Sequence, residues 1–99
     1  MRLTPKQIDM IRQTVAEIAG SDARVRLFGS RLDDAAKGGD VDLMVEVAHQ
    51  VESPAPLSAR IAGRISRAMA GRRVDVVFFA PNLEWLAIHE AARNEGVLL

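Results

Sequence analysis

The sequence predicts an α/β (α+β) fold in which a small mixed β-sheet packs with about three helices. Two observations predict it: segments whose apolar residues recur at helical spacing, and runs that alternate or are rich in β-branched residues. Their order along the chain is helix, strand, strand, helix, strand, helix, which favours a mixed sandwich. A chain of 99 residues buries roughly two-thirds of its unfolded surface, so we expect one domain over residues 1–99.

Capping residues mark both ends of the first predicted helix. Thr4 is a suitable N-cap, Pro5 follows at the first helical position, and Gln7 completes a capping box. Gly20 is placed to end the helix with a positive φ angle. The apolar residues of one face recur at steps of three and four: Ile8, Ile11, Val15 and Ile18.

Two strands are predicted next, joined by a polar loop. Residues 24–28 alternate and stop at Gly29-Ser30, residues 31–39 are polar, and residues 40–48 alternate strictly. In the second strand the residues predicted to share one face are Val41, Leu43, Val45 and Val47. Those predicted to face the other way are Asp40, Asp42, Met44 and Glu46.

A second helix is predicted after a linker marked by Pro54 and Pro56. Its apolar residues repeat every four positions: Leu57, Ile61, Ile65 and Met69. Gly71 ends this pattern. Residues 74–80 then read as a largely buried strand ended by Pro81.

The third helix is predicted to begin at Asn82, whose side chain is a suitable cap, and to run to about Asn94. Gly96 closes it. The apolar tail over residues 97–99 is expected either to pack on the core or to face a partner.

Composition excludes several classes of protein. Lys and Arg number 13 against 13 Asp and Glu, which argues against a non-specific nucleic-acid coat or a binder of anionic membranes. Cysteine is absent, so disulfide scaffolds and cysteine-ligated zinc are excluded. The sequence lacks both an apolar run of roughly 18 residues and a signal-peptide core. We therefore expect a cytoplasmic protein.

Three aspartates are candidates for one catalytic site. Asp40 and Asp42 open the second strand, and Asp75 lies early in the third. Two residues along a strand span roughly 6.6 Å and return to the same face, and a neighbouring strand lies about 4.8 Å away. The three carboxylates can therefore form one triangle, provided that the two strands are adjacent and in register. Such hard oxygen ligands, without nearby histidine or cysteine, suit Mg²⁺ or Mn²⁺ and phosphoryl-transfer chemistry.

A phosphate-binding turn is predicted just after the first strand. Gly29 permits close approach of the backbone, and Ser30 contributes a hydroxyl beside free N–H groups. Arg31 adds a positive charge suited to a triphosphate. The three residues together are candidates for nucleotide binding.

These segments resemble the minimal nucleotidyltransferase family, a branch of the DNA-polymerase-β-like superfamily. The resemblance is carried by the segments Leu27-Phe28-Gly29-Ser30-Arg31, Gly38-Gly39-Asp40-Val41-Asp42-Leu43 and Val74-Asp75-Val76-Val77, and it extends to the closing Glu95-Gly96-Val97-Leu98-Leu99. It implies that Gly29 and Ser30 hold nucleotide phosphates and that Asp40 and Asp42 ligate Mg²⁺. It further implies that Asp75 is the third carboxylate, a metal ligand that activates the incoming hydroxyl. Nine residues separate Ser30 from Asp40, where the commonest family form has ten.

The resemblance also implies a reaction and a partner. The superfamily transfers a nucleoside monophosphate from a nucleoside triphosphate to a hydroxyl and releases pyrophosphate. Short members are typically antitoxins paired with a HEPN-domain ribonuclease toxin, and some transfer AMP from ATP to a tyrosine of that toxin. The alternative is a catalytically weak or inactive binding module that neutralises a HEPN toxin by covering its active site.

Several candidate residues also have a purely structural interpretation. Asp75 could form a salt bridge with Arg72 or Arg73, and Arg31 could pair with Asp33 or Asp34. Trp85 fits either a core position or an interface. The two histidines, His49 and His89, lack ligand-spaced companions and are expected at the surface or an interface. Five arginines lie on the second helix and in the turn after it: Arg60, Arg64, Arg67, Arg72 and Arg73. They indicate either a solvated face or a binding surface for an acidic partner or RNA.

Overall fold

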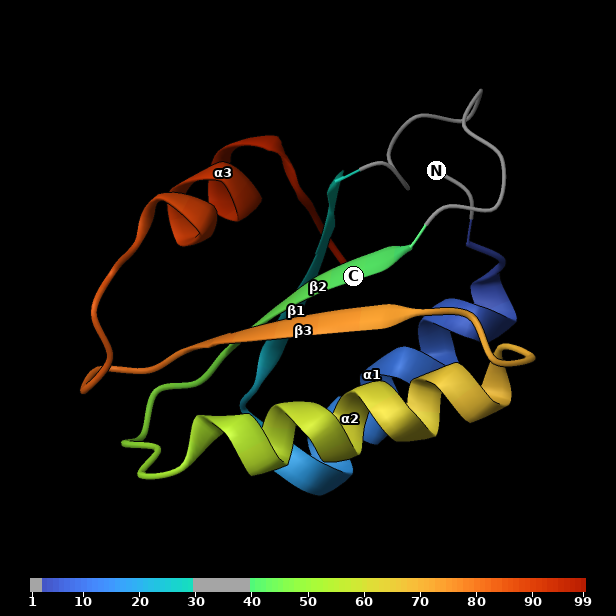
Figure 1. The fold of residues 1–99 in the computed structure, drawn as a ribbon, viewed down its shortest axis with the longest axis horizontal. Helices are drawn as coiled ribbons and strands as arrows, with labels where there is room; N and C mark the ends of the chain where they lie inside the picture. Colours follow the sequence, from blue (N-terminus) through green and yellow to red (C-terminus); the bar gives the residue numbers. More distant parts are fainter. Residues whose placement is uncertain (1–2, 30–39) are drawn as a thin grey trace.

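A computed structural model describes residues 3–29 and 40–99, and in this part of the chain three helices pack with a four-stranded sheet (Figure 1). The α+β fold and the order of its first six elements are as predicted. The short β4 is an addition, because the apolar tail pairs with the sheet. The elements are α1 (Pro5–Ala19), β1 (Arg24–Phe28), β2 (Val41–Glu46), α2 (Pro54–Ala68), β3 (Val74–Phe79), α3 (Ala87–Glu95) and β4 (Val97–Leu98).

The sheet is mixed, with the strand order β3-β2-β1-β4. Strand β2 pairs antiparallel with β1 and parallel with β3, which requires the crossover that α2 supplies. Strand β4 pairs antiparallel with the other side of β1. The two strands that carry the three aspartates are therefore neighbours.

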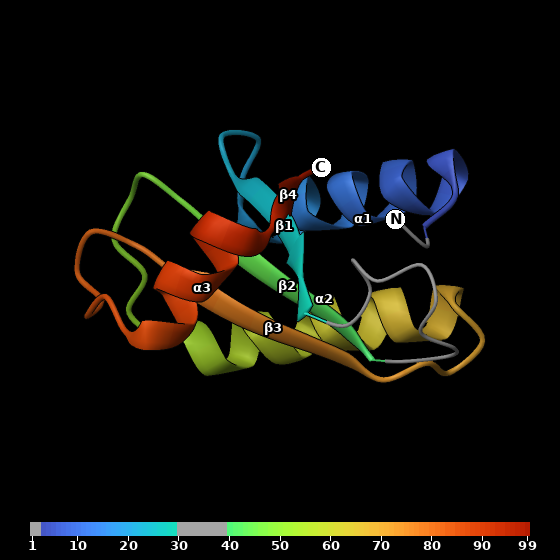
Figure 2. The ribbon, with the colours of Figure 1, turned by 90° about the horizontal axis from the view of Figure 1, so that it is seen from above.

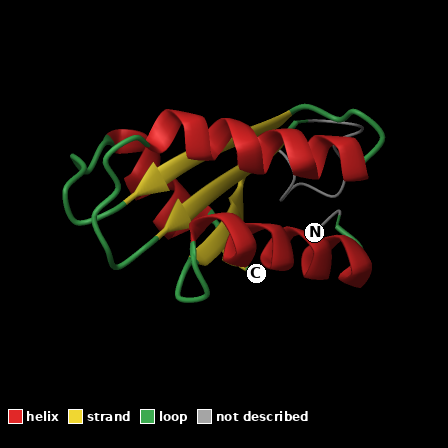
Figure 3. Cartoon of the chain, turned by 90° about the horizontal axis from the view of Figure 1, so that it is seen from below, coloured by secondary structure: helices red, strands yellow, loops and turns green. Residues whose placement is uncertain are grey.

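Helices α1 and α2 lie side by side on one face of the sheet (Figures 1 and 3). The alternation of β2 is confirmed, since Val41, Leu43 and Val45 point into this layer and are fully buried. Helix α3 covers only part of the opposite face (Figure 2). Met44, predicted on the other face of the strand, is also fully buried, and α3 packs against β1 and β2 on that face.

The start of α1 is the predicted capping box. Thr4 Oγ1 accepts a hydrogen bond from the backbone N–H of Gln7 at 3.1 Å, and Gln7 Oε1 accepts one from the N–H of Thr4 at 3.0 Å. Gly20 ends the helix with a φ of 113°. Two of the predicted apolar residues, Ile11 and Val15, are fully buried between the helix and the sheet.

The two prolines predicted to mark a linker instead belong to α2. The helix begins at Pro54 and includes Pro56 in its first turn. Backbone N–H groups in the first turn have no acceptor within the helix, so proline loses no hydrogen bond there. The linker prediction was wrong for this reason.

The prediction that Asn82 caps the third helix was also wrong. Asn82 Oδ1 accepts a hydrogen bond from the N–H of Val51 at 2.9 Å, and its Nδ2 donates to the carbonyl of Val51 at 2.8 Å. These bonds tie the segment after β3 to the segment after β2. The helix begins only at Ala87.

The start of α3 depends on His89, which is buried rather than at the surface. The N–H of Leu86 donates to His89 Nδ1 at 2.9 Å, so the neutral ring carries its proton on Nε2. Nε2 then donates to the carbonyl of Phe78, also at 2.9 Å. The three-residue spacing from Leu86 to His89 is the sequence signal that could have revealed this cap.

No helix within residues 3–29 and 40–99 combines the length and apolar character required to span a bilayer.

Candidate active site

Two of the three candidate carboxylates are brought together by the pairing of β2 with β3. Asp42 and Asp75 are direct register partners, so both project from the same face of the sheet. This is the face opposite α1 and α2, at an end that α3 leaves open (Figure 2). Asp40 precedes β2, and the next residue, Val41, continues the ladder by donating its N–H to the carbonyl of Arg73 at 2.9 Å. The register condition of the predicted triangle is therefore met.

The charges around Asp42 change its pKa. The pKa of Asp42 is raised above its usual value, first by partial burial and then by the negative charges of Asp75 and Asp40. Arg73 lowers the same pKa and opposes this effect. An additional cation would therefore be favoured beside Asp42.

Arg73 lies between the two flanking carboxylates. Its Nε is 3.5 Å from Asp75 Oδ2 and 3.9 Å from Asp40 Oδ2, so the salt bridge considered for Asp75 is present. The Arg73 side chain is 72% exposed and that of Asp75 is 47% exposed. Exposed pairs of this kind contribute about 0–1 kcal/mol and are screened by salt.

The exposure of Asp75 corrects the expectation of a largely buried third strand. Strand β3 is at the edge of the sheet, and its face near Asp75 is open, so several of its residues are only half-buried. Because the Asp75 carboxylate is half exposed, its desolvation costs little free energy. Burial is therefore no argument that Asp75 is functional. Its register with Asp42 is the stronger argument.

Gly29 is fitted closely against Asp42. It follows β1 directly, beside the register pair of Phe28 and Asp42, and has a φ of 78°. A Cβ atom built on Gly29 would lie 2.3 Å from Asp42 Oδ2. Glycine is therefore required both by the backbone conformation and by the approach of the carboxylate. The other two predicted nucleotide-binding residues, Ser30 and Arg31, lie outside the described residues.

The carboxylates fit a divalent cation by their chemistry and by their shared negative field. Hard oxygen donors without nitrogen or sulfur are the ligands that Mg²⁺ and Mn²⁺ prefer. Residues 3–29 and 40–99 nevertheless contain no group of three or more histidine, cysteine, aspartate or glutamate side chains already arranged to hold a metal ion. In this arrangement Arg73 supplies the positive charge between Asp40 and Asp75.

Trp85 belongs to an aromatic cluster at the far end of the same sheet face. Its ring meets Phe79 edge-on at 4.7 Å and stacks on His89 at 5.3 Å, measured between ring centroids. Trp85 Nε1 donates to Glu90 at 2.7 Å, and the Arg93 guanidinium lies 4.4 Å from the ring centroid. These contacts hold α3 on the sheet, so Trp85 has a packing role within the chain.

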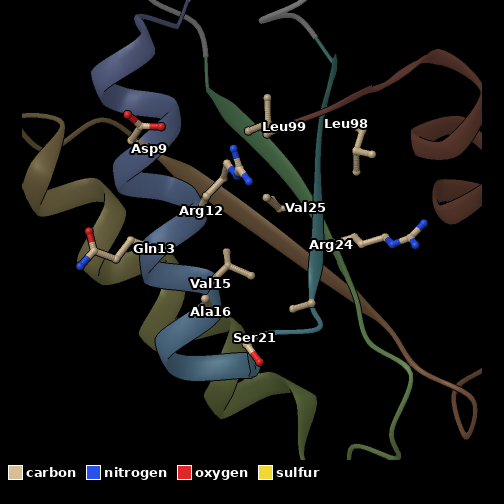
Figure 4. Close-up of a pocket in the computed structure, with 11 residues that line it drawn as sticks. Asp9, Arg12, Gln13, Val15, Ala16, Ser21, Arg24, Val25, Leu98 and Leu99 are labelled. Carbon is tan, nitrogen blue, oxygen red and sulfur yellow. The ribbon is translucent and has the colours of Figure 1, made fainter.

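A cleft of about 700 Å³ lies between α1 and the β1–β4 side of the sheet (Figure 4). It is lined by charged residues that include Asp9, Arg12 and Arg24, and its apolar wall includes Val25 and Leu99. In Figure 4 the Arg24 side chain points away from α1, so the two guanidinium groups do not converge. None of the three candidate aspartates lines this cleft.

Comparison with known proteins identifies the family. A model of the nucleotidyltransferase domain matches residues 8–98, a span that includes β1, β2 and β3 with all three aspartates. A search of curated proteins and a search of solved structures each returned no match. The family match covers most of the chain, and the chain therefore belongs to the nucleotidyltransferase domain family.

Proposed function

We propose that this chain is a Mg²⁺-dependent nucleotidyltransferase that transfers AMP from ATP to a hydroxyl of a partner protein. The observation that carries the proposal is the register of Asp42 with Asp75, beside Asp40 and the closely packed Gly29. The proposed acceptor is a tyrosine of a HEPN-domain toxin, with this chain as the antitoxin. That acceptor follows from the resemblance of the motif to minimal nucleotidyltransferases.

Each site residue has a proposed role. Asp40 and Asp42 would hold the metal ion, and Asp75 would be the third ligand and would accept the proton of the incoming hydroxyl. When bound, Mg²⁺ would supply positive charge that offsets the negative charge on the phosphates. Gly29 would allow the backbone to approach the phosphates, together with Ser30 and Arg31.

The proposed reaction is a displacement at the α-phosphorus of ATP. The acceptor oxygen forms a bond to phosphorus as its proton passes to a carboxylate, for which Asp75 is the candidate. The bond from phosphorus to the oxygen that bridges to the β-phosphate breaks, and pyrophosphate leaves with the electron pair. The products are an AMP-modified acceptor and pyrophosphate.

Docking on a protein is supported by apolar residues at the surface. Leu86 and Ile88, near the start of α3, are 49% and 44% exposed. Val97 and Leu98 pair through β4 with β1, yet they are 41% and 49% exposed. These side chains could be buried by a partner protein.

The direct test uses ATP labelled at the α-phosphate, Mg²⁺ and the protein encoded by the adjacent reading frame. We expect label on that protein with the wild type and loss of at least about 100-fold with Asp42→Ala, because both metal binding and charge balance are disturbed. Asp9→Ala is the matched control, since Asp9 is an exposed carboxylate on α1. Absence of transfer with Mg²⁺ and with Mn²⁺ would contradict the proposal.

A second candidate function is neutralisation of a HEPN toxin by occlusion, with little or no catalysis. The observation that favours it is Arg73, which already lies between Asp40 and Asp75. Occlusion depends on the docked surface rather than on the carboxylates. If Asp40→Ala and Asp42→Ala abolish neutralisation while the complex still forms, simple occlusion is wrong.

A further inference from the structure

The outer face of α2 carries positive charge without any negative charge on the same helix. All five charged residues between Glu52 and Asp75 are arginines, and three of them follow one another at steps of four and three along the helix: Arg60, Arg64 and Arg67. All three are exposed. Like charges at these spacings repel by about 0.2–0.5 kcal/mol per pair. Glu17 on α1 offsets part of this repulsion at Arg64, and a bound anionic partner would offset the rest.

These arginines border a shallow groove of about 330 Å³. Two small residues, Ala59 and Gly63, also line it. A Cβ atom at Gly63 would lie 3.4 Å from Arg67 Nη1, so the Arg67 head group lies close to the helix backbone. Small side chains between the arginines allow a segment of another protein to lie close to the helix. The carboxylates of that segment can then accept hydrogen bonds from the guanidinium groups.

Two of the three arginines have no carboxylate partner within residues 3–29 and 40–99. Arg64 Nη2 pairs with Glu17 Oε2 on α1 at 2.7 Å, whereas no such pair is found there for Arg60 or Arg67. Glu17 therefore uses one nitrogen of Arg64, whose other N–H groups can still donate to a partner carboxylate. Arg60 and Arg67, at the two ends of the groove, can each receive a further negative group.

The C-terminal end of α2 lies at the same end of the molecule as the candidate active site, which is on the opposite face of the sheet. Helix α2 ends at Ala68, and the turn that follows carries Arg72 and Arg73 to the start of β3. Arg73 there contacts Asp75. In Figure 1 the end of α2 and the starts of β2 and β3 lie at the same end of the molecule.

We propose that the α2 groove docks an acidic helix of the acceptor protein, with carboxylates at positions i, i+4 and i+7 that match Arg60, Arg64 and Arg67. The choice of acceptor rests on the proposed function, whereas the docking itself requires neither nucleotide nor metal. A second copy placed groove to groove would oppose arginine to arginine. The stretch 54–73 contains no aromatic residue for base stacking, which favours protein over RNA.

The test is an NMR titration of the ¹⁵N-labelled full chain with an alanine-based 14-residue helical peptide carrying Glu at i, i+4 and i+7. We expect shifts of the Arg60 and Arg67 Nε–H signals and of the Gly63 amide. A counterpart peptide with Gln at the three positions should bind at least about 5-fold more weakly, since each exposed charge pair contributes about 0.2–1 kcal/mol.

The matched variants each remove two positive charges. Arg60→Gln/Arg67→Gln should weaken binding of the Glu peptide about 3- to 10-fold. Lys6→Gln/Arg12→Gln, at exposed positions on α1, should change it less than about 2-fold. Circular dichroism shows whether each variant is folded. Equal weakening by the two double variants, or shifts that map away from α2, would overturn the proposal.

Two further measurements separate this proposal from others. The first titrates a single-stranded 12-nucleotide RNA. If the RNA binds the groove more tightly than the Glu peptide does, the docking proposal is wrong and the ligand is a nucleic acid. The second measures the oligomeric state without peptide, and a dimer with shifted α2 signals would overturn the docking proposal in favour of self-association. Peptide binding without AMP transfer counts against the proposed function alone. If Arg60→Gln/Arg67→Gln transfers AMP with the same KM for the acceptor as the wild type, the result counts against docking in the groove and leaves the proposed function intact.

Discussion

Replacement of Gly29 by alanine tests the contact between the turn after β1 and the Asp42 carboxylate. Gly29 has a φ of 78°, and a Cβ atom there would lie 2.3 Å from Asp42 Oδ2, 3.2 Å from its Cγ and 3.4 Å from its Cβ. The oxygen is far too close, Cγ is also tighter than an ordinary contact, and only Cβ is at a normal distance. The carboxylate must therefore rotate away from the position that the site requires.

The expected cost has two parts. A left-handed backbone costs a residue with a Cβ atom about 1–2 kcal/mol. Rotation of Asp42 away from its preferred side-chain conformation adds about 0.5–1.5 kcal/mol. Gly29→Ala should therefore lower the free energy of unfolding by about 1.5–3.5 kcal/mol. A displaced carboxylate should reduce nucleotidyl transfer by about 100-fold.

Gly71 provides the matched control for this experiment. Its φ is 82°, and no heavy atom lies within 4 Å of a Cβ built on it, so Gly71→Ala should show the backbone cost alone. Urea denaturation of both variants, repeated in an Asp42→Ala background, isolates the contact. The excess cost of Gly29→Ala over Gly71→Ala should disappear in that background. An equal excess with and without the Asp42 side chain would refute the reasoning.

Three further predictions concern charge and capping. The raised pKa of Asp42 means that its ionisation opposes folding, so the stability it contributes is present at acid pH and lost as pH rises through its folded pKa. Asp42→Asn should therefore be more stable than the wild type by urea denaturation at pH 7 but not at about pH 3, and equal stability at both would contradict this. Arg73→Gln should raise the pKa of Asp42 further, because a neighbouring positive charge is lost. It should also increase the affinity for Mg²⁺ about 1.5- to 5-fold, measured from the increase in Tm as the metal is added. Unchanged metal affinity would count against a metal site beside Arg73. His89→Ala should lower stability by about 2–4 kcal/mol, because a buried N–H and a carbonyl lose their partner, whereas exposed His49→Ala should stay within about 0.5 kcal/mol in the same denaturation series.

Local features of the fold were predictable because their causes lie within a few residues. The capping box at Thr4 and Gln7 and the two faces of β2 follow from hydrogen bonds and side-chain alternation at short range. The same reasoning failed where a distant segment intervened. Asn82 bonds to Val51 instead of capping a helix, and Met44 is fully buried on the sheet face that α3 partly covers.

The candidate site was predictable as a set of residues but not as a geometry. The spacing of Asp40 and Asp42, together with the isolated Asp75, is enough to indicate a carboxylate cluster. The three carboxylates lie close together only because β2 and β3 pair in parallel across a helical crossover. No local sequence pattern specifies that pairing. The sequence left Arg72 and Arg73 as alternatives for a salt bridge with Asp75, and the structure shows Arg73 beside both Asp75 and Asp40.

The sequence by itself determined the first six elements and their order, the alternation of β2 and the carboxylates suited to a divalent cation, since each depends on residue type and short-range spacing. Only the tertiary structure decided that Asp42 and Asp75 are register partners, that Gly29 leaves room for the Asp42 carboxylate, and that Asp75 remains half exposed. The physical reason is that these contacts join segments far apart in the chain, and their distances arise from strand pairing and layer packing rather than from local backbone preference.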